Sequence, residues 1–397
     1  MIMQSEDRTM PRSEKIRIAY CEGNTDGTIG GSYYSLLFLV ESIDKSRFDP
    51  LVIFRNRNAL WSRFEQVSEV RAVPVRTPVR GRYSFLRRGI NFTRFLMMGV
   101  EEALFLRRQR IQLLHLNNSV TRNHDWMLAA LIAGIPCITH ERGINPKVSQ
   151  LTRVLGSRLR AVLCISTAVR DALVQSGLSG IPLYVIHNGL DPSRIRPGCS
   201  AEQFRGIHRI SPTRRVIGMI GNIKEWKGQE VVIRALPAVT RRFPEILCLF
   251  VGDTSPEDAP YEHHLRQLIE DIGLREHVLF TGFCPNVADA LNVMEIMIHA
   301  SIAPEPFGRV LLEAMAMKKP VVASRDGAVQ EIVVDGETGF TFTPGSSVEL
   351  ADRVICLLES RNKVEAYSAA GYRRLVSNFH VKQNVARTVD IYERIMG

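Results

Sequence analysis

The sequence predicts an α/β protein made of two doubly wound domains. Short apolar runs alternate with amphipathic stretches along most of the chain, a pattern typical of parallel sheets built from βαβ units. The alternation pauses at a polar stretch, residues 188–215, which is rich in Pro, Ser and Arg, and then begins again. A length of 397 residues suits two domains of roughly 150–200 residues each.

The first half is expected to hold buried strands separated by amphipathic helices. The expected strands are IRIAY (16–20), LVIF (51–54), LLHL (113–116), CIT (137–139), AVLCI (161–165) and LYVIH (183–187). The expected helices are residues 32–43, 124–134 and 167–176.

The second half repeats this pattern from Arg215 onward. Its expected strands are VIGMIG (216–221), ILCLFVG (246–252), VLFTG (278–282), IMIHA (296–300), PVVAS (320–324) and GFTF (339–342). Its expected helices are residues 228–242, 261–272, 308–317 and 346–360, followed by helices without a further strand over 362–396.

These elements predict domains over 1–190 and 191–378 and a C-terminal helix over 379–397 that packs back toward the first domain. Ligands of doubly wound sheets bind outside the carboxyl ends of the strands. We therefore expect the site to lie in a cleft between the domains.

The net charge of +10 is concentrated in one window. Residues 71–110 contain ten arginines, no lysine and only two acids, Glu101 and Glu102, so this window carries +8 of the total. Within it, 76–110 interleaves Arg with aromatic and aliphatic residues. One interpretation is a basic amphipathic surface that meets an anionic membrane or acceptor; another is a solvated helix face with a core-facing apolar stripe. No recognition motif accompanies the charge, so we expect no nucleic-acid partner.

The cysteines and the N-terminus suggest the compartment. Seven cysteines are scattered without CxxC spacing, which favours reduced thiols in a cytoplasmic protein. The first residues lack the apolar stretch of a signal peptide, and no segment has the length of a membrane span. The sequence therefore predicts a cytoplasmic protein whose membrane contact, if any, is peripheral on the inner face of the cell membrane.

The segment APEPFGRVLLEAMAMKKPVVAS (303–324) carries the most chemistry. Glu305 precedes a Pro-Phe-Gly turn, a helix is expected from Gly308, and Glu313 lies in that helix. A helix N-terminus after a glycine turn offers free amides and a positive dipole end to a pyrophosphate. Glu313 is placed to bond vicinal hydroxyls such as those of a ribose, and Glu305 to reach a sugar ring. The alternative is a pair of surface carboxylates, since acids are favoured near helix starts anyway.

The Glu-x7-Glu spacing, with Phe-Gly after the first Glu and Glu-Ala-Met-Ala around the second, resembles the motif of retaining family 4 glycosyltransferases (glycosyl transferases group 1). Further segments resemble the same family in the same order. They are GTIGGSYYSLLFLVESI (27–43), ISTAVRDAL (165–173), HNGLD (187–191), GNIKEWKGQE (221–230) and PVVASRDGAVQEIVVDGETGFTFTPGSSVELA (320–351). The resemblance implies the GT-B fold, with two facing Rossmann-like domains, an N-terminal acceptor side and a C-terminal nucleotide-sugar side.

The resemblance also implies roles for individual residues. Glu305, Lys227 and His140 are expected to be the catalytic group, with His140 at the end of a strand and contacting the transferred sugar. The expected donor-binding residues are Gly30, Gly31, Asn222, Lys227, Phe307, Gly308, Arg309, Val310, Leu311 and Glu313. Asn222 stands where many family members have Arg, so one positive charge on the β-phosphate is missing, and Lys224 or Arg309 is a candidate to replace it.

The reaction implied is retaining transfer of a hexosyl unit from a UDP- or GDP-sugar to a glycan or lipid-linked acceptor, in cell-surface polysaccharide or glycolipid synthesis. Glu305 would position the donor sugar while the departing phosphate accepts the acceptor's proton. No DxD motif stands in a strand-end loop, so we expect no metal, and we expect no cofactor besides the sugar nucleotide. Two alternatives stay open: a GT-B sugar phosphorylase or epimerase, and a non-catalytic nucleotide-sugar-binding protein.

Overall fold

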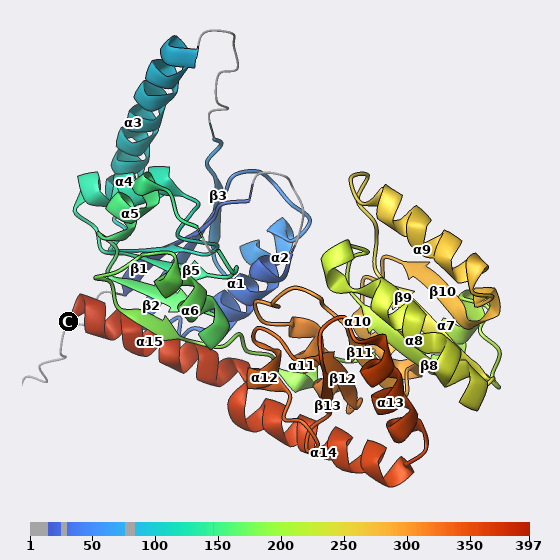
Figure 1. The fold of residues 1–397 in the computed structure, drawn as a ribbon. Coiled ribbons are helices and arrows are strands. Elements are labelled where there is room, and N and C mark those ends of the chain that lie inside the picture. Colours follow the sequence, from blue (N-terminus) through green and yellow to red (C-terminus); the bar gives the residue numbers. More distant parts are fainter. Residues whose placement is uncertain (1–14, 25–29, 76–83, 146) are drawn as a thin grey trace, which may run out of the picture.

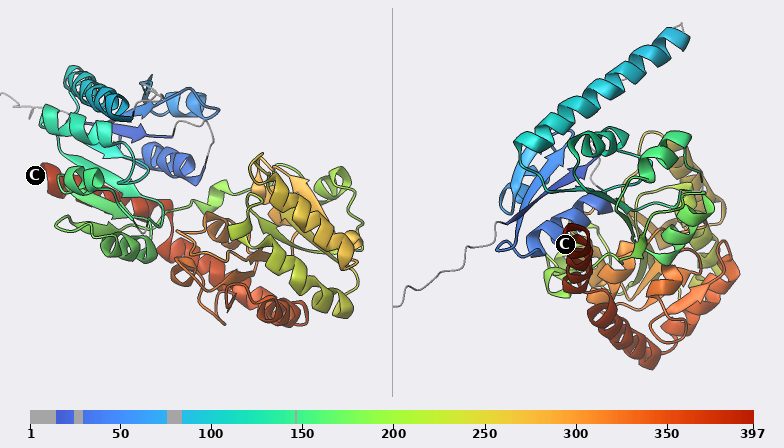
Figure 2. Two further views of the ribbon diagram at one scale, coloured as in Figure 1. Left: turned by 45° about the horizontal axis from the view of Figure 1, so that its top comes forward. Right: turned by 90° about the vertical axis from the view of Figure 1, so that its left-hand side faces the viewer.

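The computed structural model describes residues 15–24, 30–75, 84–145 and 147–397, and gives the backbone alone for 84–87. These residues form two parallel sheets, each covered by helices on both faces (Figures 1 and 2). This confirms the predicted fold class. The predicted strands are all present, with ends that differ from the expected ones by at most three residues.

The first sheet has seven parallel strands in the order β3-β2-β1-β4-β5-β6-β7. They are β1 (Ile16–Glu22), β2 (Phe48–Phe54), β3 (Glu69–Ala72), β4 (Leu113–Leu116), β5 (Cys137–Glu141), β6 (Ala161–Cys164) and β7 (Leu183–Val185). Its helices are α1 (Gly31–Ser42), α2 (Trp61–Glu65), α3 (Ser84–Arg108), α4 (His124–Ala133), α5 (Gln150–Gly156) and α6 (Thr167–Gln175).

Side-chain alternation along β1 shows why both faces of this sheet are covered. Ala19 and Cys21 face one hydrophobic layer, which includes residues of α3 and α4. Ile18 and Tyr20 face a second layer, which includes residues of α1 and α15 (Val381–Met396). A strand buried on both faces reads as a continuous apolar run, which is why the sequence pattern found it.

The second sheet has six parallel strands in the order β10-β9-β8-β11-β12-β13. They are β8 (Arg215–Ile220), β9 (Ile246–Val251), β10 (Val278–Gly282), β11 (Ile296–His299), β12 (Val321–Ser324) and β13 (Phe340–Phe342). Its helices are α7 (Ala201–Ile207), α8 (Gln229–Arg242), α9 (Ala259–Asp271), α10 (Val287–Val293), α11 (Arg309–Ala316), α12 (Val329–Ile332), α13 (Ser347–Leu358) and α14 (Arg361–Asn378). In both sheets the strand order reverses beside the first strand, β1 or β8, which marks the ligand-binding edge of doubly wound sheets.

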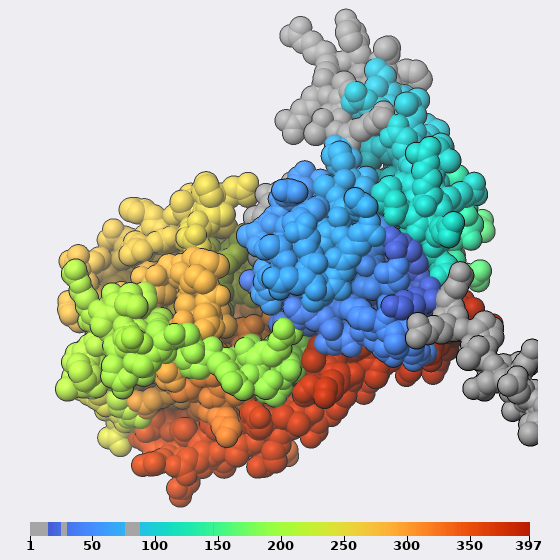
Figure 3. Space-filling view, turned by 180° about the vertical axis from the view of Figure 1, so that it is seen from behind, coloured from blue at the N-terminus to red at the C-terminus, as the bar shows by residue number. Residues whose placement is uncertain are grey.

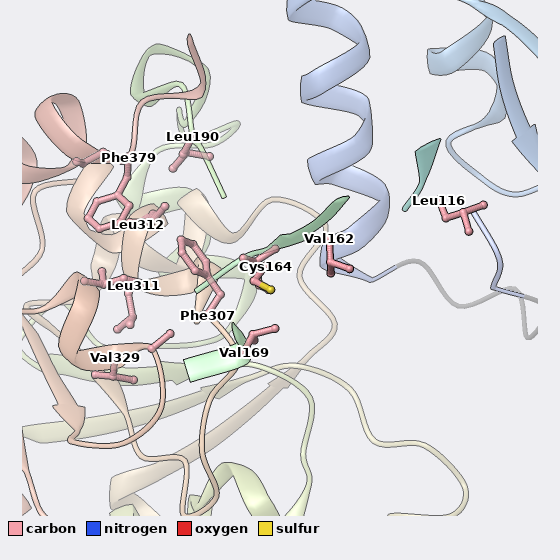
Figure 4. Close-up of a cluster of buried hydrophobic side chains, with 14 of the residues drawn as sticks. Leu116, Val162, Cys164, Val169, Leu190, Phe307, Leu311, Leu312, Val329 and Phe379 are labelled. Atoms are coloured by element: carbon pink, nitrogen blue, oxygen red, sulfur yellow. The ribbon is translucent and has the colours of Figure 1, made fainter. Parts of the chain in front are cut away.

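Buried apolar side chains join the two halves. One cluster contains Val162 and Val169 of the first half together with Phe307 and Leu311 of the second (Figure 4). The chain end spans the same junction: α14 packs on α11, and α15 packs on α1. In the space-filling view from behind, the red C-terminal segment runs along the underside of both halves (Figure 3). Apolar packing therefore holds the two strand-end edges opposite each other.

The arginine-rich window includes a long helix that projects from the first half. Residues 76–83 lie outside the described part of the chain, whereas α3 runs for 25 residues and extends past the body of the domain (Figure 1). One face of α3 packs on α4, with Ala103 and Leu106 buried. Apolar side chains spaced four residues apart are nevertheless exposed along α3: Phe92, Leu96, Val100 and Leu104. The interpretation of this window as a solvated helix with a core-facing apolar stripe therefore accounts for the side chains that pack on α4. It does not account for the exposed apolar side chains.

Candidate active site

A cavity of about 470 Å³ lies where the strand ends of the two sheets meet. Its lining from the first half is Gly31, Ser32, Asn118, Ser119, Thr121, Arg122, Arg142, Gly143, Asn145, Ile165 and Asn188. Its lining from the second half is Trp226, Glu305, Pro306, Phe307, Gly308 and Arg309. A cavity of this size between two domains, lined by apolar surface together with charged and amide side chains, suits a substrate of nucleotide-sugar dimensions.

Glu305 is the most constrained ionisable group of this cavity. Its Oε2 atom lies 2.7 Å from Lys227 Nζ, 3.2 Å from His299 Nε2 and 3.2 Å from Ser301 Oγ. The side chain is only 7% exposed. Burial alone would raise the pKa of Glu305, but the His299 hydrogen bond and the Lys227 charge hold it far below its ordinary value. Glu305 is therefore an ionised carboxylate at every pH at which the protein is handled.

The loop before α12 contacts the backbone of Glu305 and fixes its position. The Ala328 amide donates to the Glu305 carbonyl oxygen at 2.9 Å. A Cβ atom on Gly327 would lie 2.3 Å from that same oxygen, so only glycine allows this approach. The carboxylate consequently has a fixed backbone as well as fixed partners.

The N-terminus of α11 faces the cavity as the spacing predicted. Gly308 has φ of 82°, the left-handed conformation that glycine adopts without strain, and it is the N-cap of α11. Phe307, Gly308 and Arg309 line the cavity, whereas the Leu311 side chain lies in the core and Val310 is half-buried. Val310 can therefore contribute only through its backbone amide, one of the first-turn amides that lack an acceptor within a helix. The Leu311 amide already donates to the Gly308 carbonyl oxygen at 2.9 Å.

Arg309 connects the two halves across the cavity. Its Nη1 atom donates to the carbonyl oxygen of Gly31 at 3.0 Å, and the guanidinium lies 5.3 Å from the Tyr34 ring centroid. Gly31 begins α1 and lines the cavity beside Arg309, whereas Gly30, the N-cap of α1, is not among the described residues that line it. The cavity thus has a positive group on the donor-side helix that contacts the acceptor-side loop.

Several predicted donor-side groups lie outside the lining of this cavity, among them Lys227, which pairs with the lining residue Glu305. Glu313 is half-buried and pairs with Arg309 at 3.4 Å. Asn222 is exposed, and its carbonyl oxygen accepts from Gln229 at 3.0 Å. Lys224 pairs with Asp258 at 3.0 Å. Of the two candidates to replace the missing arginine, Arg309 lines the cavity and Lys224 does not.

His140 departs from its expected place. It is buried in β5 and is not among the described residues that line the cavity. Its Nδ1 atom lies 2.7 Å from His115 Nε2, and His115 Nδ1 lies 2.6 Å from the Tyr392 hydroxyl of α15. Burial lowers the pKa of His115 to about 3 and holds the pKa of His140 well below its ordinary value. The expectation that His140 points into the cleft is therefore wrong, because this position faces the α15 side of the sheet.

The residues after His140 take its place at the cavity. The Arg142 guanidinium lines the cavity and donates to Asn117 and Asn188 at 2.8 Å. Buried Glu141 accepts from the Val120 amide at 2.9 Å and from Asn145 at 2.9 Å. Burial raises the pKa of Glu141 to about 7. Glu141 therefore fixes the loops that line the cavity by accepting hydrogen bonds from them, while the Arg142 guanidinium places a positive charge at the cavity.

Sequence reasoning missed the residues that accompany Glu305 and Lys227. His299 and Ser301 bond the carboxylate, and the Trp226 ring lies 4.0 Å below the Lys227 ammonium. A polar residue that ends an otherwise apolar strand, as His299 does, is the signal that could have found the first of them. Among the residues that the structure describes, no cluster of His, Cys, Asp or Glu could hold a metal ion.

Two family models match the chain, and together they extend over most of its length. Residues 29–194 match the model described as glycosyltransferase family 4, and residues 200–374 match the model described as glycosyl transferases group 1. The two matches meet where the polar stretch separates the sheets.

Curated relatives resemble the chain over part of their length. The lipopolysaccharide core biosynthesis mannosyltransferase LpsB of Rhizobium meliloti is 27% identical over 54% of this chain and 62% of the relative. A GDP-mannose-dependent phosphatidylinositol monomannoside mannosyltransferase of Mycolicibacterium smegmatis is 29% identical over 64% of this chain and 67% of the relative. The chain thus spans about two thirds of the length of these relatives.

Solved structures show the same fold over nearly the whole chain. Anabaena HepE in complex with UDP-glucose has a TM-score of 0.78 at 25% identity, covering 94% of this chain and 99% of that one. A glycosyltransferase of Rickettsia africae has a TM-score of 0.79 at 19% identity, covering 96% and 99%. With both domains matched by their models and the GT-B arrangement shared, the chain belongs to the group 1 glycosyltransferases.

Proposed function

We propose that the protein is a retaining, metal-independent glycosyltransferase that moves a hexosyl unit from a UDP- or GDP-sugar to a glycan or lipid-linked acceptor. The names of its relatives support this class of reaction, since they include mannosyltransferases of lipopolysaccharide core and phosphatidylinositol mannoside synthesis. Anabaena HepE, solved with UDP-glucose, supports a nucleotide sugar as donor.

One observation carries the proposal: a single cavity is lined by the α11 N-terminus, Glu305 and Arg309, and Lys227 pairs with Glu305 at 2.7 Å from beside that lining. The α11 amides and Arg309 suit the diphosphate, since anions bind at helix N-termini and guanidinium groups bond phosphate oxygens. Lys227 adds a third positive group beside the same helix. The ionised Glu305 lies where it can bond sugar hydroxyls and stabilise positive charge at the anomeric carbon.

The proposed chemistry needs no nucleophile from the protein. The bond from the anomeric carbon to the phosphate oxygen breaks, and its electron pair leaves with the nucleoside diphosphate. The acceptor oxygen bonds the anomeric carbon on the same face and gives its proton to the departing phosphate. Preorganised positive groups at the leaving phosphate supply the electrostatic stabilisation that is usually the largest catalytic contribution.

A thermal-shift screen of UDP- and GDP-sugars tests the donor assignment. At a ligand concentration about 100-fold above Kd, the matching donor should raise Tm by about 5–10 °C. The K227M variant should lose most of that shift, whereas K382M, a change at an exposed lysine on α15, should keep it. The absence of a shift with every sugar nucleotide contradicts the proposal. A shift with no turnover in the presence of acceptors supports the non-catalytic alternative.

The exposed face of α3 extends the proposal to an anionic membrane surface. Phe92 is 61% exposed, and Leu96, Val100 and Leu104 follow it on the same face. Arg88 is exposed on the projecting part of α3, and Arg108 and Arg110 are exposed at the other end of the helix, where it meets the domain. Apolar side chains that enter the headgroup region and arginines worth about 1 kcal/mol each near anionic lipid would together hold the protein at the surface. Among the described residues, no helix is both long and apolar enough to cross the bilayer.

Vesicle flotation tests this surface. The protein should float with phosphatidylglycerol vesicles at low salt, float less at 0.5 M salt, and stay unbound with phosphatidylcholine alone, because salt screens the arginines. Changing Phe92, Leu96 and Val100 together to Ser should reduce flotation at least tenfold. The matched control changes three exposed apolar residues elsewhere, Ile207, Phe283 and Val348, to Ser and should float like wild type. Equal flotation of both triple variants would exclude α3 as the contact.

A further inference from the structure

Glu331 on α12, in the second half, reaches across to the first half. Its Oε2 atom accepts from the Thr167 amide at 2.9 Å, and its Oε1 atom accepts from the Ala168 amide at 3.2 Å. His187 Nε2, in the segment after β7, lies 2.8 Å from the same carboxylate. One side chain therefore joins α6, the segment after β7 and the second half.

The contact is chemically matched on both sides. Thr167 and Ala168 open α6, a helix of nine residues, and their amides have no acceptor within the helix. Ser166 caps the helix in the usual way by accepting from Val169, so the remaining amides are left for Glu331. An anion at a helix N-terminus also meets the positive end of the dipole. Although burial raises the pKa of Glu331, His187 and the two amides lower it, so the carboxylate is charged at neutral pH.

The same contact borders the cavity. The Ser166 hydroxyl donates to the Pro306 carbonyl oxygen at 2.8 Å, directly beside Glu305. Glu331 itself follows Gly327 and Ala328, the two residues that hold the Glu305 backbone. His187 packs on Phe307 and Phe379, with ring centroids 6.1 and 5.4 Å away. A shift of α6 relative to α12 would therefore move Ile165 relative to Pro306, and both residues line the cavity.

We propose that Glu331 is a positioning residue that caps α6 from the opposite half and so sets the acceptor side of the cavity against Glu305 in the closed arrangement. This inference rests on the proposed transfer reaction. Apart from Gly30 and Gly31, the groups proposed to bind the nucleotide belong to the second half, so the loss of this contact should weaken transfer to the acceptor much more than nucleotide binding.

Two single variants and their combination test the contact from both sides. E331Q keeps the size of the side chain and removes its charge. T167P removes the hydrogen bonds that Thr167 makes, at the first helical position, where proline is well tolerated and where Ser166 is already extended. The matched control is E349Q, because Glu349 also accepts from a backbone amide, that of Thr343 at 2.8 Å, but within the second half.

The expected result has three parts. E331Q and T167P should each lower kcat/KM for the acceptor at least tenfold, equivalent to about 1.4 kcal/mol, while Kd for UDP or GDP stays within twofold. Small-angle scattering should give a larger radius of gyration for both variants than for wild type and E349Q. The double variant should fall little further than either single variant, since both remove one contact.

Three results overturn the inference: unchanged scattering with unchanged kcat/KM in both variants, fully additive losses, or a nucleotide affinity that falls in parallel with kcat/KM. If E331Q does not fold, the comparison of T167P with E349Q still shows whether the scattering, kcat/KM and the nucleotide affinity change. If wild type transfers no sugar from any donor, the proposed function fails. The radius of gyration of the variants, compared with that of wild type and E349Q, then shows by itself whether the Glu331 contact holds the two halves together.

Discussion

E305Q should lower kcat by about 10²–10³-fold, the loss typical when one preorganised electrostatic group is removed from an active site. Glutamine has the same shape and can still bond Ser301, so the cavity geometry should persist. The negative charge that faces Lys227 at 2.7 Å and that would stabilise positive charge on the sugar is lost. Since the pKa of Glu305 lies far below its ordinary value, protonation of this group should not lower wild-type activity at any pH above about 4.

Steady-state release of nucleoside diphosphate measures this effect. The matched control is E295Q, because Glu295 forms an ion pair of similar length, 2.7 Å to Arg215, at the start of the second sheet and far from the cavity lining. E295Q should keep wild-type turnover. Turnover of E305Q within a factor of two of wild type would contradict the role assigned to Glu305.

R55M should destabilise the first half by about 3–5 kcal/mol, the cost of breaking a buried ion pair by removing one partner. Arg55 follows β2 and is buried with Glu102 of α3 at 2.8 Å and Asp125 of α4 at 2.6 Å. Its guanidinium also lies 5.3 Å from the Trp126 ring centroid. Methionine fills much of the volume but leaves the Asp125 carboxylate without its cation and the Glu102 carboxyl group without its hydrogen-bond donor.

Urea unfolding at pH 7 measures the loss, with E102Q as the control that keeps Arg55 and its hydrogen bond. Burial first, and then Asp125, raise the pKa of Glu102 from 4.5 to about 8. Between those pH values Glu102 is protonated in the folded protein and ionised in the unfolded chain. Its contribution to the free energy of unfolding is therefore full below about pH 4.5 and is lost as the pH rises through 8. E102Q should remove that decline. A loss below about 1 kcal/mol in R55M would contradict the assignment of Arg55 as the centre of this cluster.

The sequence predicted those features of the fold that depend on continuous apolar runs. Most of the twelve expected strands are buried on both faces, whereas β7 and β10 are half-buried, and strands buried on both faces read as uninterrupted hydrophobic segments. The missed strand β3 reads EVRA and lies at the sheet edge, where charged side chains are favoured and no apolar run forms.

The site could be predicted as far as local geometry determines it. Glu305, Gly308 and the α11 N-terminus lie close together in the sequence, so their spacing together with the family resemblance predicted them at the cavity. His140 could not be placed in this way, because its direction depends on which face of β5 packs against α15, and the strand pattern is apolar on both faces. The Glu331 contact joins residues 164 positions apart and could emerge only from the packing of the two halves.

Metal-free turnover tests the central claim most directly. Wild-type protein in excess EDTA is given UDP-glucose or GDP-mannose with a candidate acceptor, nucleotide release is followed, and the anomeric configuration of the product is read by NMR. We predict release of UDP or GDP that depends on Glu305, together with a product that keeps the donor's configuration. Turnover that requires added Mg²⁺ or Mn²⁺, or a product of inverted configuration, would contradict this account.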